Sequence, residues 1–389
     1  MAPDRPVRGI GDVAAGPILH VLNDGWFMDV VGWAFEEAAP GANTFVAVGF
    51  DPHDVRVPHT AHVMGVGNDV AGLRELNSLI AQSRVAVFHN VSETLAATLA
   101  SAPPSTLRVW SGWGGDYYGS TYDNYAGQLA PATRKLVHSA VRPTYWAGRA
   151  LRALRLGPVL SSAAKASDVF SAPIPEDVSV FRRRFPGFHG RYSQLNYSTV
   201  EDSYATGSRP AFGKSILLGN SASPTNNHLD LLGLLTKIDL GSRKIVAPLS
   251  YGDPDYAAAV ARAGRRLLGD RFTAITEFLP LDEYNAIVAD CGIVMMGHLR
   301  QEGLGNVLRA IWQGARLVLD SRNPITRHLQ AHGVDVGLVQ KLTDDGFPGE
   351  PPSREQLEAR ELYLDENWSR RAVVKNVEAL LALANEVTA

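Results

Sequence analysis

The sequence has little cysteine, no excess of charge of one sign and no long apolar run. Cys291 is the one cysteine among 389 residues, which excludes an internal disulfide and a zinc site built from several thiolates. The 37 basic and 40 acidic side chains give a formal net charge of −3, so no global positive field attracts nucleic acid. No run approaches the roughly 18 apolar residues that span a bilayer, and Met1–Arg8 lacks the apolar core of a signal peptide. We therefore expect a cytoplasmic protein.

A dinucleotide-binding fingerprint is also missing. Gly9-Ile-Gly11 precedes the first predicted strand instead of following it, and Gly65-Val-Gly67 lacks a third glycine at the required distance. The pair Asp253-Pro-Asp255 has the form of a metal motif found in some sugar transferases, but Pro254 at a helix start makes Asp253 a natural N-cap. We expect neither a cofactor nor a metal ion.

Short β-branched runs alternate with helical patterns in two series, which indicates an α/β protein with parallel sheets. The length suits two domains of about 150 residues or more. We expect an N-terminal Rossmann-like domain over 1–208, with the stretch 172–208 irregular, a C-terminal Rossmann-like domain over 209–350, and helices over 351–389 that pack across the joint. The predicted strands are 18–22, 44–48, 62–66, 85–89 and 107–110, then 214–218, 244–248, 272–276, 292–296 and 316–319.

Ligands of such sheets bind at the carboxyl ends of the strands, so the residues after each strand are the informative ones. In the second series these residues form small polar loops and one glycine-rich turn that opens a helix, which suits a diphosphate held by backbone amides. The alternative is a set of ordinary capped turns. The predicted donor-binding residues are Asn220, Ser221, Asn227, His228, Ser250, Tyr251, Arg300, Glu302, Gly303, Leu304, Gly305 and Asn306.

In the first series, a carboxylate beside aromatic side chains suits a sugar or polyol acceptor. Asp116 follows a glycine-rich turn and is the predicted general base, with His89 and Asp24 as alternatives. The predicted acceptor-binding residues are Asn23, Trp113 and Tyr117. The competing interpretation is that the aromatic side chains are buried in the domain joint and that Asp116 caps the next helix.

The stretch 124–167 contains no acidic residue, while basic side chains alternate with apolar ones. Such a face could dock on an anionic membrane and so meet a lipid-linked acceptor. A solvated helix face is the alternative. The basic residues that would carry the contact are Arg134, Lys135, Arg149, Arg152 and Arg155.

The chain resembles the TDP-N-acetylfucosamine:lipid II N-acetylfucosaminyltransferase family, glycosyltransferase family 56. The residues that carry the resemblance span about 18–330 and are Ile216–Ser221, Asn227-His228, Pro248–Gly252, Asp282–Tyr284, Arg300–Gly305, and His89 with Trp113–Tyr117. The resemblance implies a GT-B fold, in which two Rossmann-like domains face each other across a cleft. It also implies a dTDP-linked 4-acetamido-4,6-dideoxygalactose donor and an undecaprenyl-diphosphate-linked saccharide acceptor.

These observations predict a metal-independent glycosyltransferase that moves a deoxysugar from a dTDP- or UDP-linked donor to a hydroxyl of the acceptor. It would lie in the cytoplasm, or peripherally on the inner face of the membrane. One alternative is a nucleotide-sugar-hydrolysing epimerase of the same architecture, which needs no second substrate. Another is a non-catalytic protein that binds a membrane surface.

Overall fold

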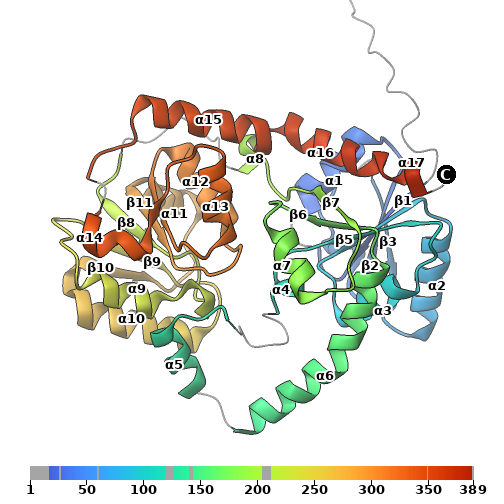
Figure 1. The fold of residues 1–389 in the computed structure, drawn as a ribbon, viewed down its shortest axis with the longest axis horizontal. Coiled ribbons are helices and arrows are strands. Elements are labelled where there is room, and N and C mark those ends of the chain that lie inside the picture. Colours follow the sequence, from blue (N-terminus) through green and yellow to red (C-terminus); the bar gives the residue numbers. More distant parts are fainter. Residues whose placement is uncertain are drawn as a thin grey trace, which may run out of the picture.

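The computed structural model describes residues 17–25, 28–58, 61–119, 127–139, 143–203, 212–347 and 349–387. Its strands form two sheets, and the strand pairs within this part of the chain are all parallel (Figure 1). The first sheet runs, in spatial order, β3 (His62–Val66), β2 (Asn43–Val48), β1 (Ile18–Leu22), β4 (Val85–His89), β5 (Leu107–Ser111), β6 (Val169–Ala172) and β7 (Arg191–Gln194).

The second sheet is wound in the same way. In both sheets the strand order reverses beside the first strand, and in doubly wound sheets ligands bind at this switch point. The switch points lie between β1 and β4 in the first sheet and between the corresponding two strands in the second. The second sheet runs β10 (Phe272–Ile275), β9 (Ile245–Pro248), β8 (Ser215–Leu218), β11 (Cys291–Met296), β12 (Arg316–Leu319) and β13 (Gly337–Leu338).

Helices connect the strands and cover the sheets (Figure 1). Several begin at residue types that favour the N-cap position. The side chains of Asp69, Ser92, Asp253 and Asn323 each accept a hydrogen bond from a backbone N–H of the first turn. The helices are α1 (Met28–Ala38), α2 (Val70–Ala81), α3 (Glu93–Ser101), α4 (Gly115–Tyr118), α5 (Pro131–Ser139), α6 (Pro143–Ala166), α7 (Asp177–Arg184), α8 (Val200–Ser203), α9 (His228–Leu235), α10 (Pro254–Leu268), α11 (Leu281–Ala289), α12 (Leu304–Gln313), α13 (Pro324–Ala331), α14 (Leu342–Asp345), α15 (Arg354–Trp368), α16 (Arg370–Ala382) and α17 (Ala384–Val387).

The stretch 172–208, expected to be irregular, is in large part regular, so that expectation was wrong. It contains α7, β7 and α8, and β7 completes the edge of the first sheet. Aromatic packing explains why this stretch is regular. The ring centres of Phe170 and Phe181 stack 3.9 Å apart, and the ring of Phe188 meets that of Phe181 edge-on at 5.0 Å. These three rings are buried, and together they hold α7 on the sheet.

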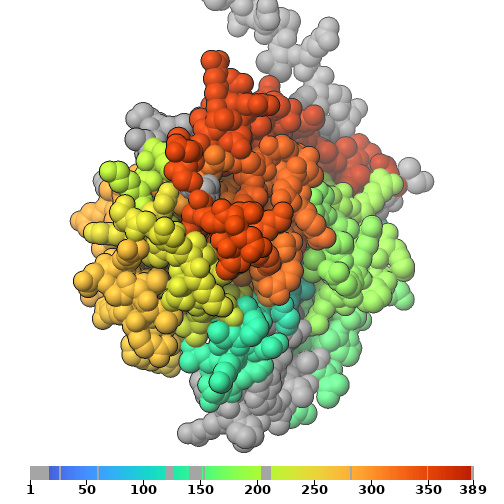
Figure 2. All heavy atoms as spheres, turned by 60° about the vertical axis from the view of Figure 1, so that its left-hand side comes forward, coloured from blue at the N-terminus to red at the C-terminus, as the bar shows by residue number. Residues whose placement is uncertain are grey.

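Helix α5 precedes β6 in the chain but docks on a helix of the second sheet. The carboxylate of Asp230 in α9 accepts hydrogen bonds from the backbone N–H groups of Ala132 and Thr133, at 2.8 and 2.9 Å. An aspartate from α9 therefore caps the N-terminus of α5, where a negative charge is stabilising. Figure 2 shows the teal α5 segment against the yellow α9 segment. The chain then returns along α6, which packs on α3 of the first sheet.

Helices α15 and α16 run consecutively over both sheets (Figure 1). Tyr363 and Trp368 of α15 are buried in the core of the second sheet, while Val373 and Val377 of α16 belong to the core of the first sheet. Arg360 holds α15 on the second sheet. Its buried guanidinium donates hydrogen bonds to Asp335 Oδ1 at 3.0 Å and to the carbonyl of Ala315 at 2.7 Å. In the part of the chain that the structure describes, no helix is long and apolar enough to cross a membrane.

Replacing Arg360 with methionine is expected to lower the free energy of unfolding by about 3 kcal/mol, because it leaves the buried Ala315 carbonyl without this donor and removes one of the two guanidinium partners of Asp335. The matched control is Arg354→Met on the same helix, whose exposed guanidinium pairs with the exposed Glu358 at 2.8 Å, and which is expected to change stability by less than about 0.5 kcal/mol. Urea denaturation of both variants measures the difference. Equal shifts would contradict the role assigned to Arg360.

Candidate active site

The loop after β8 is folded around the side chain of Asn226. Asn226 Oδ1 accepts a hydrogen bond from the backbone N of Asn220 at 2.9 Å, and Asn226 Nδ2 donates to Ser221 Oγ at 3.2 Å. A backbone N–H of this loop also donates to the carbonyl of Tyr251 at 2.6 Å, and this bond joins the loop after β8 to the loop after β9. The predicted residues Asn220, Ser221, Ser250 and Tyr251 therefore lie at the same edge of the second sheet. The Tyr251 side chain is exposed there.

Gly303 lies where the loops after β8 and β11 meet. It has a left-handed φ of 68° and begins α12, and a Cβ at this position would lie 3.3 Å from both Asn220 Nδ2 and His298 Cε1. A side chain here would be strained and crowded, so glycine is required. The backbone amides of Leu304 and Gly305 open the helix behind it, and a helix N-terminus carries the partial positive charge that holds phosphate. The predicted residue Asn306 lies in this first turn, where its backbone N bonds the Gly303 carbonyl.

Arg300 and Glu302 form an ion pair on this loop. Arg300 Nε donates to Glu302 Oε2 at 2.8 Å, and the hydroxyl of Thr225 also bonds Glu302. Burial alone would raise the pKa of Glu302, but the charge of Arg300 and these two hydrogen bonds hold it below its ordinary value. Glu302 is therefore ionised at neutral pH. This bond engages the Nε edge of Arg300, so within the described residues the guanidinium's NH₂ groups stay available to an anion.

His298 is fully buried beside this pair, and burial lowers its pKa. Its Nε2 lies 4.0 Å from Glu302 Oε2, and within the described residues neither ring nitrogen makes a hydrogen bond. Asn220 Oδ1 is likewise a buried acceptor without a donor in that part of the chain. Buried polar atoms are usually bonded, so a cluster of unbonded ones at the end of β8 and β11 indicates a place for a ligand or water.

Asn227 and His228 lie deeper than the sequence led us to expect. Asn227 Oδ1 accepts from the backbone N of Ala130 at 2.7 Å, and its Nδ2 donates to the carbonyls of Gln128 and Gly297 at 3.1 and 2.8 Å. His228 packs beneath the β8 loop, and burial lowers its pKa to about 3, so the ring is neutral. Asn227 joins protein segments to one another, and the donor site proposed below does not include it.

The loops after β5 and β11 touch at Tyr118. Its Oη accepts a hydrogen bond from the backbone N of Gln301 at 3.3 Å and donates to Asp177 Oδ1 at 2.6 Å, while Tyr117 Oη donates to Asp177 Oδ2 at 2.8 Å. The Arg300 guanidinium lies 5.8 Å from the centre of the Tyr118 ring. Tyr117, predicted to bind the acceptor, is thus buried and turned toward Asp177.

Asp177 is the main residue that the sequence did not reveal. Burial raises its pKa to about 7, against the opposing effect of the two tyrosine hydrogen bonds. The available signal was an acidic pair, Glu176-Asp177, at the start of a short helical pattern inside a stretch rich in proline and arginine. Its tyrosine partners are some 60 positions away in the chain, so the cluster could not be read from spacing.

A cavity of about 450 Å³ lies at the carboxyl edge of the first sheet, lined in part by Asn23, Asn90 and Asp116. The buried Asp116 accepts hydrogen bonds from Trp110 Nε1 at 2.8 Å and from the backbone N of Trp113 at 3.0 Å and Val91 at 3.2 Å. Burial raises its pKa, although these bonds oppose the shift. Two of the predicted residues, Asn23 and Asp116, are therefore brought to one cavity.

The alternative bases occupy different environments. Asp24 Oδ2 accepts from Asn90 Nδ2 at 3.2 Å, beside the cavity. His89 is buried at the end of β4, its Nε2 lies 3.1 Å from Nδ1 of His20, and burial holds its pKa well below the ordinary value. Trp113 is half-buried, with its ring edge-on to Tyr197 at 5.3 Å. His89 is therefore a neutral core residue in this arrangement.

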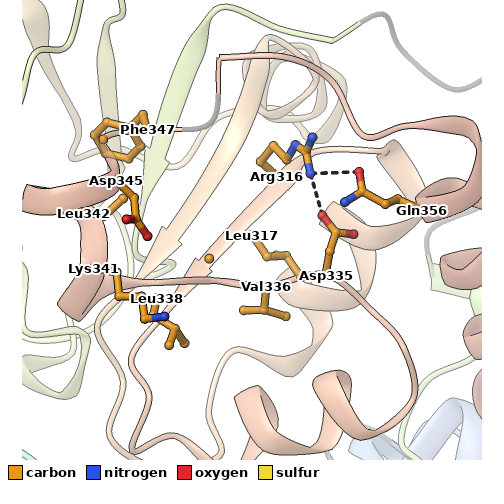
Figure 3. Close-up of a pocket in the computed structure, with 12 residues that line it drawn as sticks. Arg316, Leu317, Asp335, Val336, Leu338, Lys341, Leu342, Asp345, Phe347 and Gln356 are labelled. Atoms are coloured by element: carbon orange, nitrogen blue, oxygen red, sulfur yellow. Dashed lines mark hydrogen bonds and ion pairs between the residues drawn. The ribbon is translucent and has the colours of Figure 1, made fainter.

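A further cavity of about 320 Å³ lies at the opposite edge of the second sheet, near the first residues of β12 and β13 (Figure 3). Its arginine is fully engaged by protein acceptors: Arg316 Nη1 bonds Asp335 Oδ2 at 2.7 Å and Gln356 Oε1 at 3.1 Å, as Figure 3 shows, and its other nitrogens bond the carbonyls of Glu350 and Pro351. This charge joins α15 to the sheet, and the cavity is remote from the loops described above.

Among the described residues, no group of three histidine, cysteine or carboxylate side chains is placed to hold a metal ion.

Three solved structures share this two-sheet architecture. Sucrose-phosphate synthase from Thermosynechococcus elongatus matches with a TM-score of 0.65 and 11% identity over 95% of this chain and 99% of its own. A glycosyltransferase from Rickettsia africae ESF-5 gives 0.63 and 11% over 96% and 98%. Anabaena Alr3699/HepE, in complex with UDP-glucose, gives 0.52 and 13% over 96% and 97%. The fold is therefore GT-B, which confirms the prediction from the sequence.

The family comparison goes one step further. Residues 177–347 match the family described as 4-alpha-L-fucosyltransferase, glycosyl transferase group 56. The protein is a glycosyltransferase, and its resemblance to glycosyltransferase family 56 is confirmed over this segment, which contains β7 to β13 and the loops around Arg300 and Gly303.

The pKa of Asp177 predicts a pH dependence of stability. Between about pH 4, the ordinary pKa of an aspartate, and about pH 7, the folded protein holds a proton that the unfolded chain has released. The free energy of unfolding should therefore fall as pH rises through this window, by at most about 1.4 kcal/mol per pH unit, and this component should level off above it. Urea denaturation at several pH values, compared with Asp177→Asn, isolates the component. The same slope in both proteins would contradict it.

Proposed function

We propose that this glycosyltransferase moves a deoxysugar of the N-acetylfucosamine type from a dTDP-linked donor to a hydroxyl of a saccharide acceptor. The observation that carries the proposal is the Gly303 turn, where a required glycine, a helix N-terminus and Arg300 meet beside buried polar atoms that have no partner in the described part of the chain. The matched family is described as a fucosyltransferase, and fucose is a deoxysugar. The similar Anabaena protein holds UDP-glucose, so this fold accommodates a nucleotide-linked sugar.

In this proposal the donor diphosphate lies at the start of α12. The backbone N–H groups of Leu304 and Gly305 and the guanidinium of Arg300 take the negative charge that builds up on the leaving diphosphate. The carboxylate of Glu302, held ionised by Arg300, accepts hydrogen bonds from hydroxyls of the donor. A fixed cation and fixed amides need no reorganisation during the reaction, so this part of the site requires no metal ion.

The acceptor occupies the cavity at the edge of the first sheet, and Asp116 is the proposed general base. Asp116 lies on its wall, and a carboxyl group with a raised pKa is a stronger base than an ordinary one. The bonds from Trp110 and Trp113 fix its orientation. Asn23 and Asp24 would orient the acceptor hydroxyls.

A lipid-linked acceptor and a peripheral position on an anionic membrane stay predictions. Arg134 and Lys135 are exposed on α5, and Leu151 and Leu154 are exposed on α6, at 68% and 74%. Arg155 is exposed but pairs with Glu93 at 3.1 Å, which reduces the charge that it offers to a surface. The side chains of Arg149 and Arg152 lie outside the described residues.

The donor site can be tested by thermal unfolding with dTDP, UDP, GDP and NAD in the presence of EDTA. A ligand at 100 times its dissociation constant stabilises the folded state by about 2.7 kcal/mol, so dTDP should raise the melting temperature most. Gly303→Ala serves as the matched variant and should lose this shift, because its Cβ crowds Asn220 and His298. A dTDP shift that requires magnesium, or that survives in Gly303→Ala, would contradict the proposed donor site.

The role of Asp116 can be tested by Asp116→Ala. Loss of a general base lowers turnover by about 10² to 10⁴, whereas the dTDP-dependent thermal shift should be retained because the donor lies on the other sheet. Added formate should restore part of the rate by supplying a carboxylate in the space vacated. Near-normal turnover with intact folding would remove Asp116 from the mechanism, and Asp24→Asn would then be the variant to examine.

A further inference from the structure

A third cavity, of about 440 Å³, lies between the two sheets and is lined by five arginines. We call it the arginine cavity. Arg183 and Arg184 come from α7 of the first sheet, Arg300 from the loop after β11, and Arg322 and Arg327 from the loop after β12 and from α13. Tyr118 and Gln128 also line it. Its volume falls within the range of small-molecule sites.

The positive charge of the arginine cavity is only partly compensated. Arg300 pairs with Glu302 and Arg322 with Asp320, each at 2.8 Å. Within the described part of the chain, no carboxylate pairs with Arg183 or Arg327, and no carboxylate lines the cavity. Asp177 does not line the cavity: its carboxylate accepts hydrogen bonds from Tyr117 and Tyr118, and burial raises its pKa. Like charges brought together from two sheets repel each other unless an anion lies between them.

Gln128 supplies an independent indication of a ligand. Its side chain is 4% exposed, and its Nε2 donates to the carbonyl of Tyr118 at 2.7 Å. Its Oε1 is a buried acceptor that has no donor among the described residues. A hydroxyl group next to an anionic group of the ligand would satisfy it.

We propose that the arginine cavity binds a second phosphate-bearing ligand, separate from the donor diphosphate at the start of α12. Guanidinium groups bind phosphate oxygens in pairs of parallel hydrogen bonds, and the four arginines of the cavity other than Arg300, which the donor uses, exceed what a single carboxylate would use. The separation rests on the proposed function, because that function assigns the Gly303 turn to the donor. An occupant would bridge α7 and α13 and hold the two sheets together around the site. A phosphate on the acceptor or a free phosphate compound would supply the same chemistry.

Isothermal titration with inorganic pyrophosphate, at saturating dTDP, tests the proposal. The test variant is Arg183→Gln/Arg327→Gln, which removes one exposed arginine from each side of the cavity. The control is Arg182→Gln on the same helix, whose guanidinium donates to the Gly190 carbonyl at 3.4 Å and does not line the cavity. We expect the dissociation constant to rise at least tenfold in the double variant and to stay within twofold in the control.

Three results would overturn the proposal: no pyrophosphate binding to the wild type at saturating dTDP, equal affinity in the wild type and the double variant, or an equal loss in Arg182→Gln. If the double variant fails to fold, Arg183→Gln alone, at an exposed position, should still weaken binding relative to Arg182→Gln. If dTDP itself does not bind, the proposed donor is wrong, while the same comparison of pyrophosphate affinities, made without nucleotide, still decides the cavity.

The source of the phosphate is resolved by parallel titrations. Geranyl diphosphate represents a lipid-linked phosphate, and glucose 1-phosphate represents a sugar phosphate. Tighter binding of either ligand than of pyrophosphate, lost in the double variant, supports the cavity and identifies the source. Equal binding of all three supports a site that recognises phosphate alone.

Discussion

The charged groups of the site depend on one constraint: the carboxyl ends of the two sheets meet where Tyr118 bonds the backbone of Gln301. That contact holds the loop after β11 against the loop after β5, and it brings Arg300 over the Tyr118 ring. Asp177 accepts a hydrogen bond from the Tyr118 hydroxyl and so fixes the position of the ring. The guanidinium is thereby positioned by residues of both sheets, although it belongs to only one of them.

Burial keeps most of the titratable side chains near the site neutral. His20, His89, His228 and His298 all have lowered pKa values because each is fully buried. The arginine–glutamate pair on the β11 loop stays charged because each partner compensates the other. The result is a weakly screened environment in which a few fixed charges act strongly on a bound anion.

The strands near both switch points could be predicted from sequence because their buried runs are rich in valine, isoleucine and leucine. β6 and β7 could not: β6 has only two large apolar residues, Val169 and Phe170, and β7 carries arginine, serine and glutamine. The Arg300–Gly305 turn could be predicted because glycines and charged residues follow a strand directly. The pairing of Asp177 with Tyr117 and Tyr118 was not, because long-range contacts leave no local periodicity. The place of Asn227 was missed for the same reason, since its partners include Gln128 and Ala130, almost 100 positions earlier.

The docking of α5 on α9 means that the second sheet is not built from one continuous piece of chain. A fragment cut to residues 209–350 would leave Asn227 without the backbone of Gln128 and Ala130, and Asp230 without the two N–H groups that it caps. It would also lack Leu136, which packs on the core beneath α9. The half of the molecule that carries the Gly303 turn therefore takes part of its surface from the other half, and truncation at the apparent boundary would remove structural support along with the first sheet.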